Sequence, residues 1–277
     1  MNRRFSMRFP DGRNKALTFS YDDNVKQNAR LVDLLNSYGM KGTFNLNSGL
    51  FTDTVKMNSN TMPVSQIIEL FKDGTHEVAL HGSTHPFLEQ LSPAVCTYEV
   101  LKDREKLEQI FGCIIRGMAY PMGTYSDSVV DCLKSCGIAY SRTTKSTERF
   151  DLPVDWLRLP ATCHHNNPRL MELAKKFTSS NRHPSYPSQL FYLWGHTYEF
   201  DNDNNWNVIE EFVEYMAQFR DEIWYATNIE IYEYMTDYSR LVFAVDGSLV
   251  HNPTNRTLWF YQNDKIYSIN PGQTLQF

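Results

Sequence analysis

The stretch KALTFSYDDNVKQNARLVDLLNSYGMKGTFNL, residues 15–46, decides how this chain folds. Alternating apolar side chains predict a strand over residues 17–22. Residues 25–38 then carry apolar side chains at helical spacing, and Gly39 supplies the left-handed stop at which many helices end. Residues 42–46 predict a second strand. A strand, a helix and a strand in this order are typical of the βαβ unit, whose two strands run parallel.

The same alternation continues to about residue 239, whereas residues 145–167 carry few periodic signals. Repeated strand–helix units predict an α/β fold with a mainly parallel sheet, either open or closed into a barrel. In both forms, ligands gather at the carboxyl ends of the strands. The expected helices are 64–72, 93–111, 126–136, 168–177, 206–219 and one after 230; the expected strands are 77–80, 117–120, 138–142, 189–194 and 222–227.

Two shorter β segments flank this core. Residues 5–9 alternate and are followed by the turn Pro10-Asp11-Gly12, so we expect a hairpin with the strand over 17–22. From about residue 240 the pattern changes to short strands separated by turn-forming pairs. We therefore expect a main domain, residues 1–239, with a small β-rich extension, residues 240–277, packed on it.

The bulk composition excludes several kinds of partner. The net charge of −5 leaves no basic field to hold nucleic acid or an anionic membrane. No apolar run is long enough for a transmembrane segment, and the N-terminal residues lack the apolar core of a signal peptide. We therefore expect a cytoplasmic chain, unless a leader has been removed. The five cysteines lack a repeated spacing, and Cys132 and Cys136, four apart in an expected helix, are expected to be small buried residues.

An aspartate pair and a histidine pair each follow a predicted strand. Asp22 and Asp23 end the first strand, and His81 and His85 flank Gly82-Ser83-Thr84 after the strand at 77–80. One carboxylate and two imidazoles suit Zn²⁺ or a similar divalent ion. Neighbouring residues of a strand point to opposite sides, which favours one aspartate as ligand and the other as base. A helix cap and two surface histidines are the simpler alternatives.

Further polar groups follow the later strands. His196 closes an apolar strand beside Trp194 and could act as a general acid, or be a buried histidine without a catalytic role. Asp155 could orient such a histidine, and the neighbouring Trp156 could line a pocket; a loop cap is the alternative for Asp155. Cys163-His164-His165 resembles a nucleophile and base, but we identify no third group that would complete such a site.

The turn that runs from Tyr120 to Tyr125, YPMGTY, also follows a predicted strand. Its proline makes it rigid, and a backbone N–H group of Met122 or Gly123 could stabilise an oxyanion. Sugar rings pack well on aromatic faces, so aromatic side chains near these motifs are candidates for substrate contacts. The candidates are Tyr120, Tyr125, Trp156 and Trp194.

Taken in order, these segments resemble the five motifs of the polysaccharide deacetylases, which are the NodB-homology group or carbohydrate esterase family four. The resemblance spans residues 15 to about 235, and its first two motifs are the more specific ones. It implies a distorted (β/α) barrel with fewer than eight regular repeats, to which the C-terminal β extension is an addition. The matching segments are LTFSYDD at 17–23, HGSTH at 81–85, YPMGTY at 120–125, Asp155-Trp156 and Trp194-Gly195-His196.

The resemblance also implies roles for individual residues. Asp22 corresponds to the general base and His196 to the general acid, while the N–H of Met122 would help to bind the oxyanion. The metal would be Zn²⁺, with Co²⁺, Ni²⁺ or Fe²⁺ as alternatives. The reaction would be attack of metal-activated water on the N- or O-acetyl carbonyl of an acetylated sugar or oligosaccharide, with release of acetate. The metal ligands would be Asp23, His81 and His85.

The chain departs from the family pattern in the pocket walls. Asn24 follows the aspartate pair where many members have glycine, and Trp194 stands where leucine is usual. The third motif has Ala119 in place of the usual arginine, so Arg116 is the nearest arginine that could pair with Asp22. Two other functions remain open: a carbohydrate-binding or scaffold protein with weak or lost catalysis, and metal-dependent hydrolysis of a different amide or ester.

Overall fold

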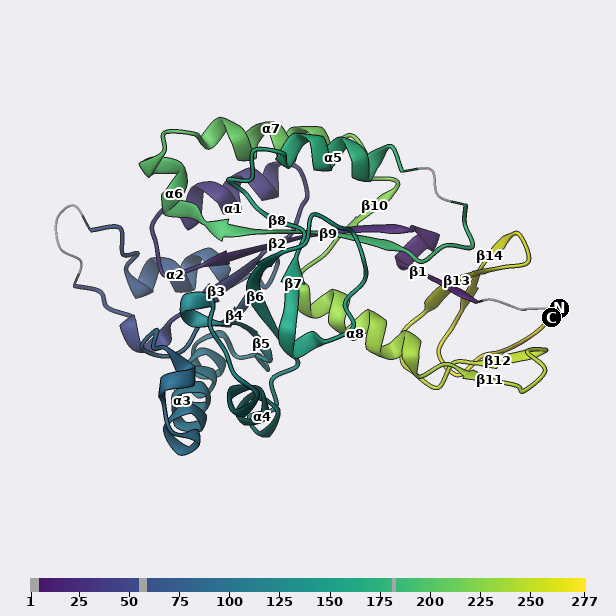
Figure 1. Cartoon of the computed structure of the whole chain (residues 1–277), viewed down its shortest axis with the longest axis horizontal. Coiled ribbons are helices and arrows are strands. Elements are labelled where there is room, and N and C mark those ends of the chain that lie inside the picture. The colour runs from purple at the N-terminus through teal and green to yellow at the C-terminus, as the bar shows by residue number, and fades with distance from the viewer. Residues whose placement is uncertain (1–4, 55–58, 181–182) are drawn as a thin grey trace.

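The computed structural model describes residues 5–54, 59–180 and 183–277. Its centre is a nearly closed parallel barrel with helices around it, as the sequence predicted (Figure 1). The strand order is β7-β6-β5-β4-β3-β2-β9-β8, and the short β10 (Ile223–Tyr225) pairs with the first half of β2. The barrel strands are β2 (Lys15–Asp22), β3 (Thr43–Leu46), β4 (Glu77–Leu80), β5 (Gly117–Ala119), β6 (Tyr140–Ser146), β7 (Leu159–Ala161), β8 (Cys163–His164) and β9 (Gln189–His196).

The barrel closes through the stretch of chain in which the sequence showed few periodic signals. β7 pairs with β6, and β8, which begins two residues after β7 ends, pairs with β9. Between them, the N–H of Thr162 donates to the carbonyl oxygen of Tyr192 at 2.9 Å. Two very short strands therefore join the two ends of the sheet, and such short strands leave little alternation in the sequence.

Strands β2 and β9 form the longest contact of the barrel and set the position of its functional end. They run parallel in an unbroken register from Lys15 beside Gln189 to Asp22 beside His196. Leu17, Phe19 and Tyr21 belong to the large apolar core, whereas the side chains between them point into the barrel. The polar residues that end β2 and β9 therefore lie side by side.

The helices cover the outer face of the barrel. In Figure 1, α5 and α7 run along one side of it, and α3 and α4 lie on the opposite side. The hydroxyl oxygens of Ser92 and Ser126 cap α3 and α4 by accepting from Val95 N–H and Val129 N–H. None of the helices in the described ranges is long and apolar enough to cross a membrane. The helices are α1 (Asn28–Ser37), α2 (Val64–Phe71), α3 (Pro93–Phe111), α4 (Asp127–Ser135), α5 (Leu170–Thr178), α6 (Thr197–Asn202), α7 (Trp206–Ala217) and α8 (Asn228–Ser239).

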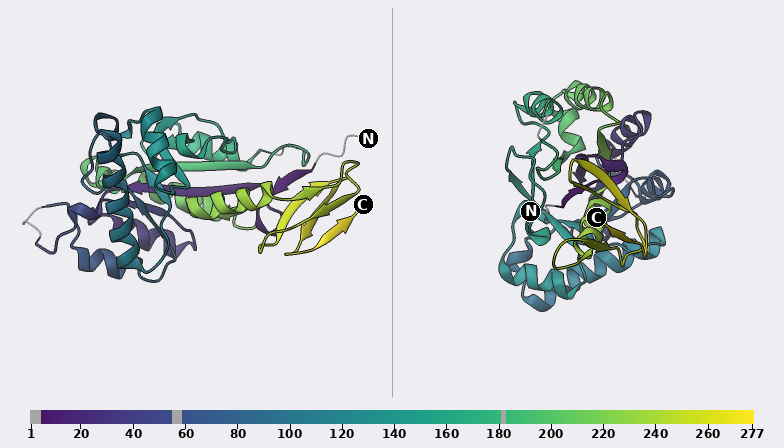
Figure 2. Two further views of the ribbon diagram at one scale, coloured as in Figure 1. Left: turned by 90° about the horizontal axis from the view of Figure 1, so that it is seen from below. Right: turned by 90° about the vertical axis from the view of Figure 1, so that its right-hand side faces the viewer.

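The C-terminal strands gather at the end of the barrel where β2 begins, beyond α8 (Figure 2). They form two small antiparallel sheets, β1-β13-β14 and β11-β12-β15. The expected hairpin between residues 5–9 and β2 is wrong, because β1 pairs with β13 and a short 3₁₀ turn, η1 (Pro10–Gly12), redirects the chain before β2. The division at residue 240 stays a prediction. The strands are β1 (Ser6–Arg8), β11 (Val242–Phe243), β12 (Leu249–His251), β13 (Leu258–Gln262), β14 (Lys265–Ile269) and β15 (Thr274–Gln276).

Candidate metal centre

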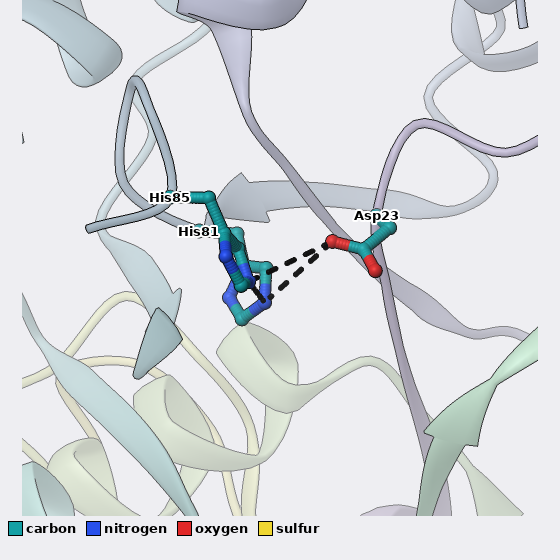
Figure 3. Close-up of side chains that lie close together, drawn as sticks. All are labelled: Asp23, His81 and His85. Carbon is teal, nitrogen blue, oxygen red and sulfur yellow. Dashed lines mark hydrogen bonds and ion pairs between the residues drawn. The ribbon is translucent and has the colours of Figure 1, made fainter. Parts of the chain in front are cut away.

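Asp23, His81 and His85 converge at the carboxyl ends of β2 and β4 (Figure 3). The Nε2 atoms of the two histidines are 3.2 Å apart, and each lies 3.9 Å from Oδ1 of Asp23. A carboxylate with two imidazoles is a donor set that Zn²⁺ and similar ions accept, and it leaves coordination positions for a substrate. The three residues that the sequence suggested as ligands therefore lie where one ion could contact all of them.

Contacts around His81 prepare it for this role. Its Nδ1 lies 2.9 Å from the carbonyl oxygen of Ala119, an acceptor, so Nδ1 carries the proton and Nε2 keeps a free lone pair that faces Asp23. Burial lowers the pKa of His81, although Asp22 and Asp23 act in the opposite direction. The side chain is therefore neutral near pH 7, as a metal ligand must be. The donor set thus fits a divalent ion.

Carboxylates from α3 hold the loop that carries the two histidines. Asp103 is fully buried and accepts from the backbone N–H groups of His81 (3.2 Å) and Ser48 (2.8 Å). Burial raises the pKa of Asp103 to about 7. Glu99, one turn earlier, accepts from the backbone and the hydroxyl of Thr84. Sequence reasoning missed both residues, although two acidic residues four apart on the apolar face of a helix were a visible signal.

Three residues around the same centre have a left-handed backbone conformation. Asp23 (φ 76°), His85 (φ 57°) and Met122 (φ 57°) all adopt the left-handed conformation that residues other than glycine rarely take. Such strain persists only where surrounding structure fixes it, and it clusters at functional sites. Met122 belongs to the turn η4 (Pro121–Gly123). Pro121 of this turn is so close to Gly82 that a Cβ added to Gly82 would lie 3.3 Å from Pro121 Cγ. The turn of the third motif thus packs against the histidine loop.

Asp22 lies next to the centre and is held by a buried arginine. Its carboxylate accepts from Nη2 of Arg142 on β6 and, at 2.9 Å, from Nδ2 of Asn45 on β3. Its Oδ2 lies 3.8 Å from Nε2 of both His81 and His196. Burial acts to raise the pKa of Asp22, but Arg142 and the two imidazoles outweigh it and lower this pKa to about 2. Asp22 is therefore an ionised proton acceptor.

The arginine beside Asp22 differs from the one that the sequence suggested. Arg116 pairs instead with Glu233 on α8, at 3.2 Å, so its proposed contact with Asp22 is wrong. Arg142 faces inward because it lies on a barrel strand beside Ala119, and its guanidinium also stacks over the ring of Trp194 at 4.4 Å. An arginine at the end of a predicted buried strand was the signal available in the sequence.

His196 has a carboxylate partner that the sequence did not suggest. Its Nδ1 lies 3.3 Å from Oε1 of Glu199, in the first turn of α6, while its Nε2 faces Asp22. Burial alone would lower the pKa of His196, but Glu199 and Asp22 raise it above the ordinary value. Asp155 instead accepts from Leu157 N–H (3.1 Å) and from Arg158 (2.9 Å), so it is a turn cap and does not orient His196.

The candidate substrate contacts divide into buried and exposed rings. Tyr120 is buried and stacks at 4.9 Å on Tyr125, which is 37% exposed. Trp194 is also buried, beneath Arg142. Trp156 is partly buried and packs edge-on against Tyr232 of α8, in the same apolar cluster as Trp194. Tyr125 is therefore the most exposed of the four residues.

Tyr198, an aromatic residue that the sequence analysis did not predict, lies next to His196. Tyr198 follows His196 by two residues, its ring centroid is 5.3 Å from that of His196, and it is partly exposed. Burial is the largest cause of its raised pKa, and the charges of Asp23 and Glu199 add to it. Tyr198 thus borders the same centre as the metal ligands, and sequence reasoning missed it because α6 was not expected.

Comparisons with known proteins concern the sequence family and the fold of this chain. The family model described as polysaccharide deacetylase matches residues 10–141. A comparison with curated proteins gave no match. A protein from Mycobacterium smegmatis assigned to the polysaccharide deacetylases has a similar structure, with a TM-score of 0.58, 15% identity, and coverage of 84% of this chain and 94% of its own.

Two further solved structures share the fold. The family 4 acetyl xylan esterase of Clostridium thermocellum, solved with a cobalt ion, has a TM-score of 0.53 and 13% identity over 79% of this chain and 90% of its own. BA3943 of Bacillus anthracis, described as a CE4 family pseudoenzyme, has a TM-score of 0.52 and 14% identity over 82% of this chain and 68% of its own. At these identities the likeness concerns the fold. The family match over residues 10–141 agrees with the resemblance to polysaccharide deacetylases that the sequence motifs indicated.

Proposed function

We propose that this chain hydrolyses acetyl groups from a carbohydrate, with the help of a divalent metal ion held by Asp23, His81 and His85. The observation that carries the proposal is the position of Asp22, whose Oδ2 lies 3.8 Å from Nε2 of His81 and 3.8 Å from Nε2 of His196. A buried, ionised carboxylate thus stands between the candidate ligands and a histidine of raised pKa. The match of residues 10–141 to the polysaccharide deacetylase family model supports the same reaction.

Each group can be given one task in this reaction. A bound Zn²⁺ or similar ion would polarise the acetyl carbonyl and acidify a water molecule. Asp22 accepts a proton from the attacking water, and Arg142 keeps its carboxylate ionised and oriented. His196 donates a proton from Nε2 to the departing nitrogen or oxygen of the sugar. The backbone N–H of Met122 is the candidate donor to the oxyanion, since that of Gly123 already bonds Tyr120.

The decisive experiment measures acetate release by the metal-reconstituted protein from a panel of N- and O-acetylated mono- and oligosaccharides. Asp23→Ala should lose the ion and the activity together. Asp22→Asn should keep the ion and lose about 10²–10⁴-fold in kcat. Asp33→Asn, on the exposed face of α1, is the matched control and should behave as wild type.

Three outcomes would point elsewhere. A loaded protein that binds sugars but releases no acetate would support a binding or scaffold role, a possibility raised by the related pseudoenzyme fold. Full activity in Asp22→Asn would remove Asp22 from the role of base. Release of a different acyl group from a broader amide and ester panel would support hydrolysis outside the carbohydrates.

A further inference from the structure

A second cluster of metal-binding side chains lies on the Nδ1 side of His196. His164, His196 and Glu199 bring two imidazoles and one carboxylate so close that their ligand atoms all lie within 4.8 Å of one another. Nε2 of His164 is 3.1 Å from Oε2 of Glu199, and Nδ1 of His196 is 3.3 Å from Oε1. The cluster has the same donor types as the Asp23 centre but uses the opposite ring nitrogen of the candidate acid.

The spacing of these atoms suits a tetrahedral ion. Bonds of about 2.0–2.1 Å to nitrogen and oxygen place neighbouring ligand atoms of a tetrahedral Zn²⁺ about 3.3 Å apart. Each imidazole lies about this far from Glu199, but from a different carboxylate oxygen: His164 Nε2 is 3.1 Å from Oε2, and His196 Nδ1 is 3.3 Å from Oε1. The three side chains are between 22% and 24% exposed, so an ion can reach them from solvent.

The fold fixes these side chains independently of the first centre. β8 places His164 beside Trp194 on β9, and their rings pack edge-on at 4.5 Å. Glu199 is held by a third histidine, the fully buried His165, whose Nε2 lies 3.1 Å from Oε2. The ring of His165 stacks on Phe200 at 4.1 Å, which limits its movement. His164 and His165 thus both contact Glu199, while Cys163 is fully buried and burial raises the pKa of its thiol.

We propose that His164, His196 and Glu199 form a second, weaker site for Zn²⁺ or a chemically similar ion, and that its occupancy inhibits the enzyme. The site is weaker because an ion must displace contacts that Glu199 already makes with three imidazoles. It is inhibitory because an imidazole that binds an ion through Nδ1 releases its Nε2 proton far less readily than an imidazolium does. The inhibition rests on the proposed function, whereas the binding of the ion does not.

The first test counts ions. Metal-free protein is dialysed to equilibrium against increasing Zn²⁺, and bound zinc per chain is measured by elemental analysis. Wild type should bind two ions, His164→Phe should lose the weaker one, and Asp23→Ala should lose the tighter one. Phenylalanine keeps the ring that packs on Trp194 but carries no ligand atom. His251→Ala, in β12 at the other end of the molecule, is the histidine control and should still bind two ions.

The second test follows acetate release during the same titration. Wild-type activity should rise as the tight site fills and should fall to a small fraction of its maximum as the weak site fills. His164→Phe should reach a similar maximum and keep it at high Zn²⁺. Excess Mg²⁺ should not inhibit either protein, because this ion prefers oxygen ligands to imidazoles.

The outcomes separate this site from the proposed function. One bound ion in wild type up to about 1 mM free Zn²⁺, the weak end of specific binding, would overturn the second site. Two bound ions in His164→Phe would also overturn the second site. If thermal unfolding shows that His164→Phe is destabilised, His164→Leu repeats the test. Two bound ions without acetate release would refute the deacetylase and leave the second site standing.

Discussion

Replacing Arg142 by methionine tests the buried ion pair on which the proposed base depends. Methionine keeps an unbranched apolar chain in a fully buried position but removes the charge that Asp22 contacts. Loss of one partner of a buried ion pair costs about 3–5 kcal/mol, because the other charge stays buried without compensation. Arg142→Met should therefore lower the free energy of unfolding by about this amount at neutral pH.

The pKa of Asp22 reports the net effect of burial, Arg142 and the two imidazoles on its carboxylate. The difference between its ordinary value of 3.8 and about 2 corresponds to about 2.5 kcal/mol. Because the folded pKa lies below the unfolded one, this stabilisation is complete above about pH 4 and is lost as the pH falls through about 2. In Arg142→Met the pKa of Asp22 should rise from about 2, since only the imidazoles of His81 and His196 then oppose the effect of burial.

Urea unfolding of the metal-free protein measures the effect without any contribution from a bound ion. Wild type, Arg142→Met, Asp22→Asn and the double variant should be compared at neutral pH. Each single variant leaves one buried charge alone, whereas the double variant removes both and should recover most of the lost stability. A decrease in the free energy of unfolding of less than about 1 kcal/mol in Arg142→Met, as for an exposed ion pair, would refute this reasoning. A double variant whose decrease equals the sum of the decreases in the two single variants would also refute it.

Three further predictions concern the acid side of the site. His196→Ala should slow hydrolysis of amides more than of activated aryl esters, whose leaving groups need little protonation; equal losses would argue against its role as acid. Glu199→Gln should lower the pKa of His196, so the alkaline limb of the pH profile of kcat/KM should move to lower pH, and an unmoved limb would exclude this effect. Gly195→Ala should cost about 1–3 kcal/mol in urea unfolding, because its Cβ would overlap the ring of His165; an unchanged midpoint would contradict this packing.

Much of the fold was predictable because it depends on local patterns. Alternating and helical periodicities located most strands and helices, and the glycine after α1 marked the end of that helix. The candidate ligands were predictable for the same reason, because each follows a strand in a fold whose strands all end on one side. The hairpin with β1 failed because the choice of pairing partner is not local: β1 pairs with β13, about 250 residues away in the chain.

The sequence by itself determined a mainly parallel sheet, which the family resemblance implied to be a barrel, and the three side chains Asp23, His81 and His85 that could hold an ion. Only the tertiary structure decided which charged groups surround them. Arg142 lies 120 residues from Asp22, a separation that does not signal a contact, and Glu199 meets His196 because His196 is the N-cap of α6, a helix that the sequence did not predict. Such contacts follow from strand register and side-chain direction, which fix the polar interior of the barrel only after all strands have assembled.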